Sequence, residues 1–237
     1  MPMRLLSWNI HKGIGGRDRR YALQRIIDCI DHERPDLVCL QEVDRLVGRS
    51  QFDDQPRILG QSLNLQSIFQ ANVSVANGTY GNLILSRWTV GSTHRISLKR
   101  GIRKARGAQL VHVETPEGVI HLVNTHLGLD ERERHWQVEL LLNHKLFQSS
   151  AAIPTLIAGD FNDWRDTLAE RSLASHGFQQ VTSPPAEFRS FPSWLPVGSL
   201  DKVFIRGGLK TERVRVVRTS LARVASDHLP MVVEFSL

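Results

Sequence analysis

Two strand-length apolar runs near the start of the chain, separated by a helix pattern, limit the folds that this sequence can adopt. The first run covers residues 4–7, and the second covers residues 36–43, DLVCLQEV. Between them, residues 21–33 carry apolar side chains at helical spacing, and Pro35 stops further helix. This order predicts a βαβ unit, whose parallel strands end at the same edge of a sheet.

A third apolar run, residues 155–158, opens directly into polar residues. Gly159 ends the run, and Asp160, Asn162 and Asp163 follow it. The length fits a buried strand, although periodicity alone does not exclude a segment of helix. The carboxyl edge of an open α/β sheet is where ligands bind. A polar turn that only caps a strand has the same composition, so this stretch alone does not decide between the two.

The remaining chain continues the α/β pattern, with β-structure dominant in residues 66–123. The expected strands there are residues 68–73, 81–86, 90–96, 108–114 and 119–124. A long helix is expected over residues 130–149, with Trp136 and Phe147 on its buried face, and a shorter helix over residues 167–175. We therefore expect a single α/β domain, residues 1–237, of two packed sheets with helices outside them.

The net charge of +6 favours a polyanionic partner, such as nucleic acid, an anionic lipid headgroup or a small phosphate. One local cluster of basic residues consists of Lys99, Arg100, Arg103, Lys104 and Arg106. Charge pattern alone fits a solvated loop as well as a binding patch.

The cysteines and the N-terminus favour the cytoplasm. Cys29 and Cys39 lie among apolar residues and predict small buried side chains in a reduced compartment. No apolar run is long enough for a transmembrane helix, and the first residues lead into a strand without the pattern of a signal peptide.

Several polar side chains recur where apolar strands end. They are Asn9, Glu42, His126, Asp160, Asn162, Asp201, Asp227 and His228. Each has an ordinary alternative, such as a strand terminator, a surface residue, a satisfied core histidine or a cap. Their shared position argues against that many separate explanations, because strand ends that meet at one edge would bring these side chains together.

Such a group would support a specific chemistry. Four carboxylates without clustered cysteine make an oxygen-lined site, which selects Mg²⁺, Mn²⁺ or Ca²⁺ over zinc. Two histidines can stabilise charge that develops on a phosphorus centre, and a further carboxylate can activate water. These are the functions that metal-assisted hydrolysis of a phosphate ester needs.

The ordered motifs resemble those of the endonuclease/exonuclease/phosphatase superfamily, which is DNase I-like. The motifs are WNI at residues 8–10, QE at 41–42, NTHL at 124–127, GDFN at 159–162, LD at 200–201 and SDH at 226–228. The superfamily includes pancreatic-type DNases, apurinic/apyrimidinic endonucleases, neutral sphingomyelinases and inositol polyphosphate phosphatases. Extended forms, WNIHKG and GDFNDW, are similar to those of small bacterial members.

The resemblance implies a four-layer α/β sandwich, with two packed mixed sheets flanked by helices and an active site at one end. It implies that Glu42 is the principal Mg²⁺ ligand, with Asn9 beside it and Asp227 at a metal-side position. Mn²⁺ is an alternative cation.

The resemblance also implies the catalytic groups. Asp160 would activate or position water, and Asn162 would hold the phosphate and the water. His228, oriented by Asp201, would stabilise the transition state, and His126 would contact the scissile phosphate.

Three further residues are candidates for binding the substrate phosphate. Arg106 could be an additional anchor, and Asn82 is a weaker candidate. His11 stands where the apurinic/apyrimidinic branch has Asp, which argues against an abasic-site enzyme and a strong second metal site. His11 could instead bind phosphate.

The function expected from these features is Mg²⁺-dependent hydrolysis of a phosphodiester, with a nuclease acting on DNA or RNA as the first candidate. Phe191 and Trp194 lie in a segment rich in proline and aromatic residues and could stack on bases. The alternative is a phospholipid or small-molecule phosphodiesterase of the sphingomyelinase-like branch, because the same segment could contact a phospholipid surface. The segment could also pack on the domain as a lid. A non-catalytic phosphate-binding module is the alternative from another class.

Overall fold

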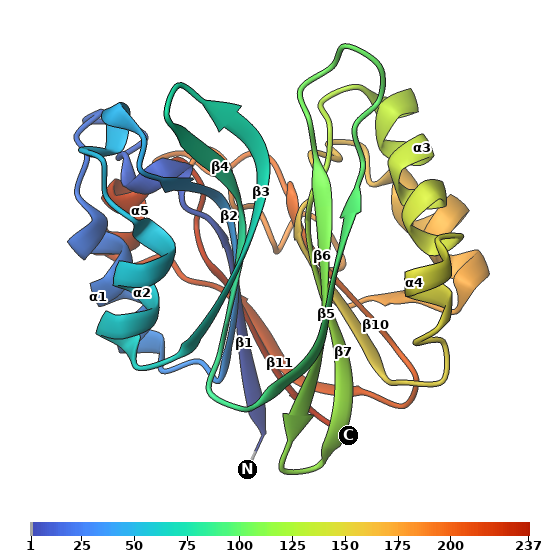
Figure 1. The fold of residues 1–237 in the computed structure, drawn as a ribbon. Helices are drawn as coiled ribbons and strands as arrows, with labels where there is room; N and C mark the ends of the chain where they lie inside the picture. Colours follow the sequence, from blue (N-terminus) through green and yellow to red (C-terminus); the bar gives the residue numbers. More distant parts are fainter. Residues whose placement is uncertain (1) are drawn as a thin grey trace.

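The computed structural model describes residues 2–237, and these residues form two six-stranded β-sheets that face each other (Figure 1). The first sheet has the order β11-β12-β1-β2-β4-β3, and the second has the order β5-β6-β7-β8-β10-β9. The strands of the first sheet are β1 (Met3–Asn9), β2 (Leu37–Arg45), β3 (Gln66–Val75), β4 (Gly78–Ser86), β11 (Lys210–Val216) and β12 (Met231–Ser236). Those of the second are β5 (Val90–Ser97), β6 (Gly107–Thr115), β7 (Gly118–His126), β8 (Thr155–Asp160), β9 (Gln179–Gln180) and β10 (Asp201–Arg206).

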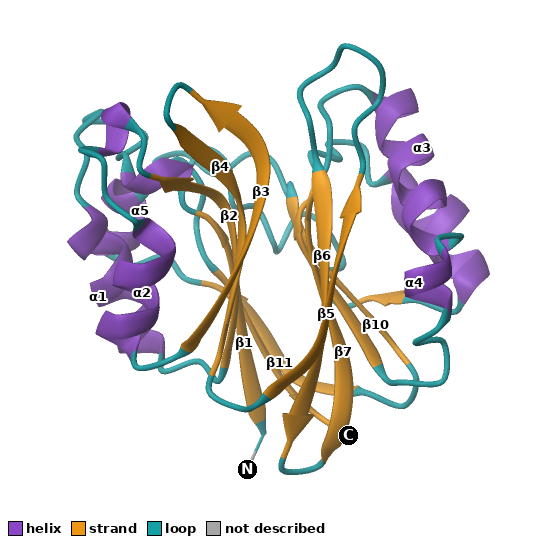
Figure 2. Cartoon of the chain, viewed as in Figure 1, coloured by secondary structure: helices purple, strands orange, loops and turns teal. Residues whose placement is uncertain are grey.

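Helices cover the outer face of each sheet (Figure 2). The first sheet is covered by α1 (Leu23–Glu33), α2 (Gln55–Leu63) and α5 (Ser220–Ala225), and the second by α3 (Glu131–Leu142) and α4 (Lys145–Gln148). The expected α/β sandwich of four layers is therefore confirmed. Within residues 2–237, the helices are too short or too polar to cross a membrane.

The strand pairing follows the βαβ expectation. Strands β1 and β2, which α1 connects, pair in parallel, with Leu5 opposite Leu37. In the second sheet β7 and β8 also pair in parallel, and β10 runs antiparallel to β8. The ends of β1, β2, β7 and β8 and the start of β10 therefore lie at one end of the sandwich, away from the two chain termini (Figure 1).

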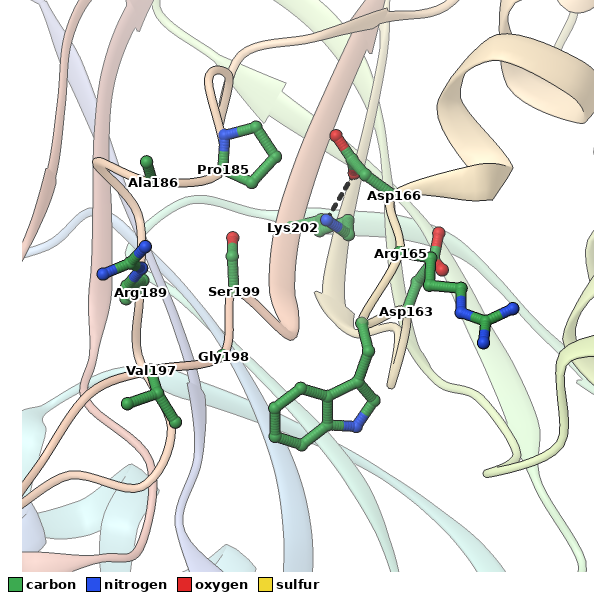
Figure 3. Close-up of a pocket in the computed structure, with 11 residues that line it drawn as sticks. Asp163, Arg165, Asp166, Pro185, Ala186, Arg189, Val197, Gly198, Ser199 and Lys202 are labelled. Carbon is green, nitrogen blue, oxygen red and sulfur yellow. Dashed lines mark hydrogen bonds and ion pairs between the residues drawn. The ribbon is translucent and has the colours of Figure 1, made fainter.

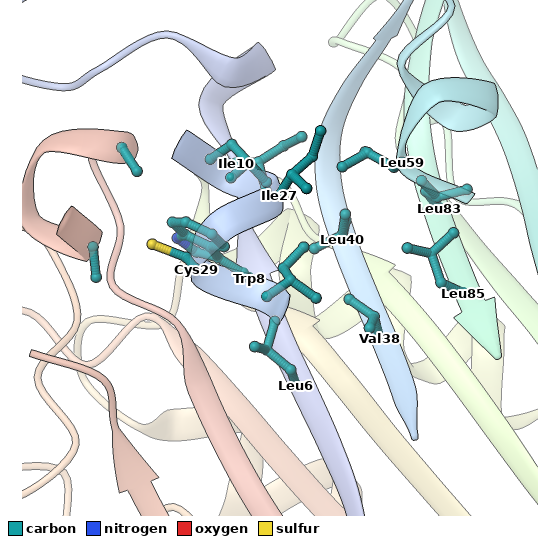
Figure 4. Close-up of a cluster of buried hydrophobic side chains, with 14 of the residues drawn as sticks. Leu6, Trp8, Ile10, Ile27, Cys29, Val38, Leu40, Leu59, Leu83 and Leu85 are labelled. Carbon is teal, nitrogen blue, oxygen red and sulfur yellow. The ribbon is translucent and has the colours of Figure 1, made fainter. Parts of the chain in front are cut away.

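Three apolar cores hold the layers together. Alternate residues of β1 serve two of them, since Leu5 packs between the sheets whereas Leu6 and Trp8 pack against the helices on the first sheet (Figure 4). Phe147 of α4 and Phe204 of β10 belong to the third core, between the second sheet and its helices. A strand buried on both faces reads as a continuous apolar run, which is why β1 and β2 lack alternation in the sequence.

Polar side chains bridge the two sheets through the apolar layer. The side-chain amide of Asn124 in β7 donates to the carbonyl oxygens of Leu40 and Leu83 in the first sheet, at 2.9 and 3.0 Å. Gln41 donates back to the Asn124 side-chain oxygen at 2.8 Å. A buried amide has given up its hydrogen bonds to water, and an unpaired one would be destabilising. The bridge therefore favours the relative position of the sheets in which these hydrogen bonds form.

The helix expected over residues 130–149 is interrupted. Helix α3 ends at Leu142, and His144 caps the N-terminus of α4 by accepting from the backbone N–H of Leu146. The expected burial of Trp136 is wrong, because its side chain is 36% exposed and lies under the Arg100 guanidinium.

The segment 167–175 differs from the expected helix, and one helix was not expected. The chain there forms a five-residue π-helix, Ala169–Leu173, and a short 3₁₀ turn that ends at Gly177 with a φ of 77°. Helix α5 has only six residues, with the Thr219 hydroxyl accepting from the backbone N–H of Ala222. So short a helix leaves little periodicity in the sequence.

Candidate active site

The candidate residues of both sheets meet at the end of the sandwich where the strands terminate. Asn9 ends β1, and Glu42 lies near the end of β2. In the second sheet His126 ends β7, Asp160 ends β8, and Asp201 begins β10. Strand pairing sets Asp160 between the other two, because it lies opposite His126 on one side and opposite Asp201 on the other.

The carboxylate of Asp160 is the centre of this group. Its Oδ2 accepts from the side-chain amide of Asn9 at 3.0 Å. The Nε2 atoms of His126 and His228 lie 3.4 and 3.7 Å from the same oxygen. Its Oδ1 accepts from the backbone N–H of Asn162 at 3.0 Å. Asp160 is 1% exposed, so these groups contact it away from bulk water.

His228 and Asp201 form a buried hydrogen-bonded pair. The Nδ1 atom of His228 lies 2.8 Å from Asp201 Oδ2, which also accepts from the Ser190 hydroxyl. Burial opposes protonation of the imidazole, but the carboxylates of Asp201 and Asp160 outweigh it and raise the pKa of His228 to about 10. The ring of Phe191 packs against His228 with 4.8 Å between ring centroids. His228 is therefore held as an imidazolium with its Nε2 directed at Asp160.

His126 has the opposite electrostatic environment. Its Nδ1 lies 3.2 Å from an Nη1 nitrogen of Arg106. Burial, assisted by this neighbouring positive charge, lowers the pKa of His126 to about 3. The site thus contains one charged and one neutral histidine on either side of the same carboxylate.

Glu42 lies in an irregular part of its strand. The pairing of β2 with β4 shifts between Leu40 and Val43, and Glu42 has a φ of 58°, which is uncommon for a residue other than glycine. Its carboxylate forms an ion pair with the ammonium of Lys12. Burial opposes ionisation, but the Lys12 ammonium outweighs it and lowers the pKa of Glu42 well below its usual range.

The surroundings of Glu42 fit a hard divalent cation. Its Oε2 is buried and, apart from the ion pair with Lys12, has no hydrogen-bond partner among residues 2–237. An ionised, anionic oxygen of this kind is the donor that Mg²⁺ and Mn²⁺ prefer. A second group, Asp160, Asp201 and His228, has ligand atoms within 4.8 Å of one another. Binding of a cation to that group would require His228 to release its proton, whereas Glu42 is already ionised.

Asp227 and His11 lie beside Asn9 and form a separate contact. The backbone N–H of His11 donates to Asn9 Oδ1 at 3.0 Å, and His11 Nε2 lies 3.8 Å from Asp227 Oδ2. The other ring nitrogen of His11 lies 2.8 Å from the carbonyl oxygen of Ile14. The structure thus joins Asn9, His11 and Asp227 at one side of the group.

Asn162 and Asn82 both use their side-chain amides to bond backbone oxygens. Asn162 donates to the carbonyl of Leu127 at 3.0 Å and has a φ of 51°. Asn82, which is 1% exposed, donates to the carbonyl of Gly107 at 3.0 Å and so links β4 to β6. Asn162 adjoins Asp160 directly, whereas the contact of Asn82 connects the sheets next to Arg106.

A cavity of about 240 Å³ has Pro185, Val197 and Lys202 in its wall (Figure 3), and its lining does not include Asp160, His126 or His228. Trp164 also forms part of its wall, and the buried Lys202 is paired with Asp166 at 2.5 Å. Two ring contacts connect its wall to His228, since Trp164 packs edge-on against Phe191, with the ring centroids 6.0 Å apart, and Phe191 packs on His228. The segment with Phe191 is thus partly packed on the domain, whereas Trp194 is 43% exposed.

Sequence reasoning missed four residues that contact the group. Lys12 and Tyr80 adjoin Glu42, Ser190 bonds Asp201, and Phe191 packs on His228 instead of standing free. Lys12 is part of the WNIHKG motif, which was a usable signal. The other three lie far from the motifs in sequence, and only the folded chain brings them to the site.

Two packed mixed sheets flanked by helices, with carboxylates, amides and histidines at one end, define a DNase I-like α/β sandwich. The chain belongs to the Endonuclease/Exonuclease/phosphatase family, whose sequence profile matches residues 6–228. Members of this superfamily are phosphoesterases, namely nucleases and phosphatases. The family inferred from the motifs is therefore confirmed.

Similar proteins share nearly the whole chain. The uncharacterised protein YbhP of Escherichia coli (strain K12) is 28% identical, and the match covers 99% of this chain and 96% of YbhP. A mannosyl-6-phosphatase from Bacteroides thetaiotaomicron VPI-5482 has a TM-score of 0.78 at 16% identity, with 99% and 100% of the two chains covered. The human Nocturnin catalytic domain with bound sulfate has a TM-score of 0.76 at 23% identity, with 99% and 93% covered. At these identities the two structures establish the shared fold alone.

Proposed function

We propose that this protein is a Mg²⁺-dependent phosphodiesterase that hydrolyses the backbone of DNA or RNA. One observation carries the proposal: Asn9, His126 and His228, from different segments of the chain, all direct side-chain nitrogens at Oδ2 of Asp160. A carboxylate surrounded by donors, next to a second buried carboxylate at Glu42, has the parts needed for attack of water on a phosphate ester.

Asp160 positions the attacking water and accepts its proton as the bond to phosphorus forms. Asn162, whose backbone N–H holds Asp160 Oδ1, lies beside the same water and the phosphate. The His228 imidazolium donates a hydrogen bond to a phosphate oxygen as negative charge develops. The bond from phosphorus to the leaving oxygen breaks, and the released alkoxide takes up a proton from solvent. Asp201 holds His228 in the orientation and charge state that this requires.

Glu42 would hold the divalent cation, with Asn9 and Asp227 on its side of the site. The bound cation supplies positive charge that stabilises the phosphate oxygens in the transition state. His126, which contacts both Asp160 and Arg106, would bind the scissile phosphate together with Arg106, and His11 and Asn82 remain weaker candidates for that contact.

The choice of nucleic acid rests on charge. The chain has a net charge of +6, and Lys12, Lys104 and Arg106 lie close to the candidate site. Nucleic-acid backbones are the polyanions that such a surface attracts. The exposed indole of Trp194 offers a stacking surface for a base.

A second candidate, a phospholipid phosphodiesterase, has its own observation. Trp194, Leu195 and Val197 are exposed together on one loop, at 43%, 64% and 57%. Exposed apolar side chains next to basic residues can insert into a membrane surface. The mannosyl-6-phosphatase of similar fold makes small phosphate esters a further class to assay.

The first experiment is nicking of supercoiled plasmid with and without Mg²⁺, with Asp160→Ala as the control variant. Nicking that requires Mg²⁺ and disappears in the variant would support the nuclease. An equal rate for both proteins would refute the role of Asp160. If the parent protein leaves plasmid and RNA intact but releases phosphocholine from sphingomyelin vesicles, the nuclease proposal is wrong and the lipid candidate replaces it.

A further inference from the structure

The basic side chains of residues 98–106, between β5 and β6, contact two different parts of the molecule. Arg103 turns toward α3, where it forms ion pairs with Asp130 and Glu133 at 3.3 and 2.9 Å. Lys104 and Arg106 turn the other way, toward Tyr80 and His126. The loop therefore supplies two of its cations to the candidate active site.

Three cations from separate segments surround one buried phenol, and we call Lys12, Arg49, Lys104 and Tyr80 the Tyr80 cluster. The Lys104 ammonium lies 4.6 Å from the Tyr80 ring centroid and 3.4 Å from its hydroxyl. The Arg49 guanidinium and the Lys12 ammonium lie 5.3 and 5.9 Å from the same centroid. Tyr80 itself is 3% exposed and adjoins Glu42.

The carboxylates nearby do not balance these charges. Arg49 is paired with Asp44 through two hydrogen bonds of 2.7 and 2.8 Å, and Lys12 is paired with Glu42. Lys104 forms no ion pair with any residue from 2 to 237, and the buried Nε of Arg106 has no hydrogen-bond partner there. Two positive charges are therefore left over beside Glu42.

Space for a ligand adjoins the unbalanced cations. A cavity of about 280 Å³ is lined by Lys104, Arg106, Gly128 and Leu129, and also by Arg103, Asp130 and Glu133. Both of these carboxylates pair with Arg103, which leaves Lys104 and Arg106 without an acidic partner in the cavity wall. His126, which contacts both Arg106 and Asp160, lies two residues before Gly128. A group bound here would be a neighbour of a phosphate bound at Asp160.

We propose that Lys104 and Arg106, next to the other residues of the Tyr80 cluster, form a subsite for a second phosphate group of the substrate. The proposal rests on the proposed phosphodiesterase function, and it assigns a substrate class: molecules in which another phosphate lies next to the scissile one. A phosphate is the ligand expected where ammonium and guanidinium groups lack carboxylate partners. The second phosphate has two sources, the next diester of a nucleic-acid backbone or a terminal phosphomonoester.

Binding of short thymidine oligonucleotides to Asp160→Ala protein tests the subsite without turnover. The four probes are TpT, pTpT, TpTp and TpTpT, measured by calorimetry with Mg²⁺. We expect at least one probe with an extra phosphate to bind about tenfold more tightly than TpT, since one charge-assisted contact contributes about that factor. Lys104→Gln should remove the difference, and Lys99→Gln, which removes an exposed charge from the same loop, should retain it.

The outcomes separate the two sources of phosphate. A gain for TpTpT assigns the subsite to the neighbouring diester, and a gain limited to pTpT or TpTp assigns it to a terminal monoester. Equal affinity for all four probes, or equal losses in Lys104→Gln and Lys99→Gln, would overturn the proposal. Hydrolysis by the parent protein is measured separately, so an inactive protein that still prefers an extra phosphate contradicts the proposed function and not the subsite.

Discussion

Arg106 fixes the tautomer of His126. The guanidinium has only donors, so the Nδ1 atom that lies 3.2 Å from Arg106 Nη1 must accept. The ring proton of the neutral imidazole is therefore on Nε2, which faces Asp160 Oδ2 at 3.4 Å. A donor directed at the candidate catalytic carboxylate is thus set by the residue immediately before the neighbouring strand β6.

Arg106→Met should release this constraint. Without the guanidinium, either tautomer can form and the pKa of His126 rises toward 6.5, because a positive neighbour is removed. We expect kcat/KM to fall by about 10²-fold, as for other single hydrogen-bonding groups in active sites. Nitrogen NMR of the imidazole reads the tautomer directly. An unchanged Nε2–H tautomer in the variant would contradict the explanation even if activity falls.

The pH dependence of activity should follow His228. Its pKa is raised to about 10, so the imidazolium persists through neutral pH and is lost above that value. In Asp201→Asn the main stabilising charge is absent, so the alkaline decline of kcat/KM should move toward pH 6.5, and kcat should fall by about 10²–10⁴-fold. If kcat/KM declines at the same pH in both proteins, His228 is not the group whose titration causes the decline.

The same pair links stability to pH. Because the pKa of His228 is raised from 6.5 to about 10 on folding, its contribution is fully present below pH 6.5. It is lost as the pH rises from 6.5 through about 10. Urea unfolding should show that the free energy of unfolding falls more between pH 6 and pH 10 for the parent protein than for Asp201→Asn. Equal decreases would show that the His228–Asp201 pair does not cause this pH dependence.

Glu42→Gln should abolish stabilisation by Mg²⁺, because the amide keeps the size of the side chain and loses its charge. A ligand at a hundredfold excess over Kd stabilises a folded protein by about 2.7 kcal/mol, which corresponds to several degrees in Tm. Thermal unfolding with increasing Mg²⁺ measures this. The exposed Glu114→Gln is the matched control, and a full Mg²⁺ shift in Glu42→Gln would place the cation elsewhere.

The buried Lys202 should make Asp166 important for stability. The Lys202 side chain is 1% exposed and its ammonium lies 2.5 Å from Asp166. Asp166→Ala leaves that charge without its partner, and we expect a loss of about 3 kcal/mol in the free energy of unfolding. Adding Lys202→Met should recover most of the loss. A double variant as unstable as Asp166→Ala would show that the charge was not the cause.

The strand pattern was predictable because strands buried on both faces leave unmistakable apolar runs. Helix α3 was harder, since its buried face is polar in the first half, at Glu133, Arg134 and Gln137, and apolar only from Val138 onward. Gln137 is fully buried because its side chain bonds Leu98 and Gly128 backbone groups, and Glu133 is 4% exposed and pairs with Arg103. A rule that places apolar residues inside therefore orients this helix wrongly and buries Trp136 in error.

The motifs predicted which residues belong to the candidate site, but not how those residues are arranged. That Asp160 lies between His126 and Asp201 follows from strand register, which an apolar run does not encode. The ion pair of Lys12 with Glu42 depends on two left-handed backbone conformations, with φ of 63° and 58°, at residues other than glycine. Such conformations are set by tertiary contacts and leave no local signature.

The hydrogen bonds from Asn124 to Leu40 and Leu83 hold the two sheets in one alignment independently of the loops. The candidate catalytic side chains belong to two sheets, so their geometry depends on the sheets keeping one alignment. The bridge lies within the sandwich, away from the loops that would meet a substrate. Changes in the length or sequence of those loops are therefore compatible with one fixed alignment of the candidate catalytic residues.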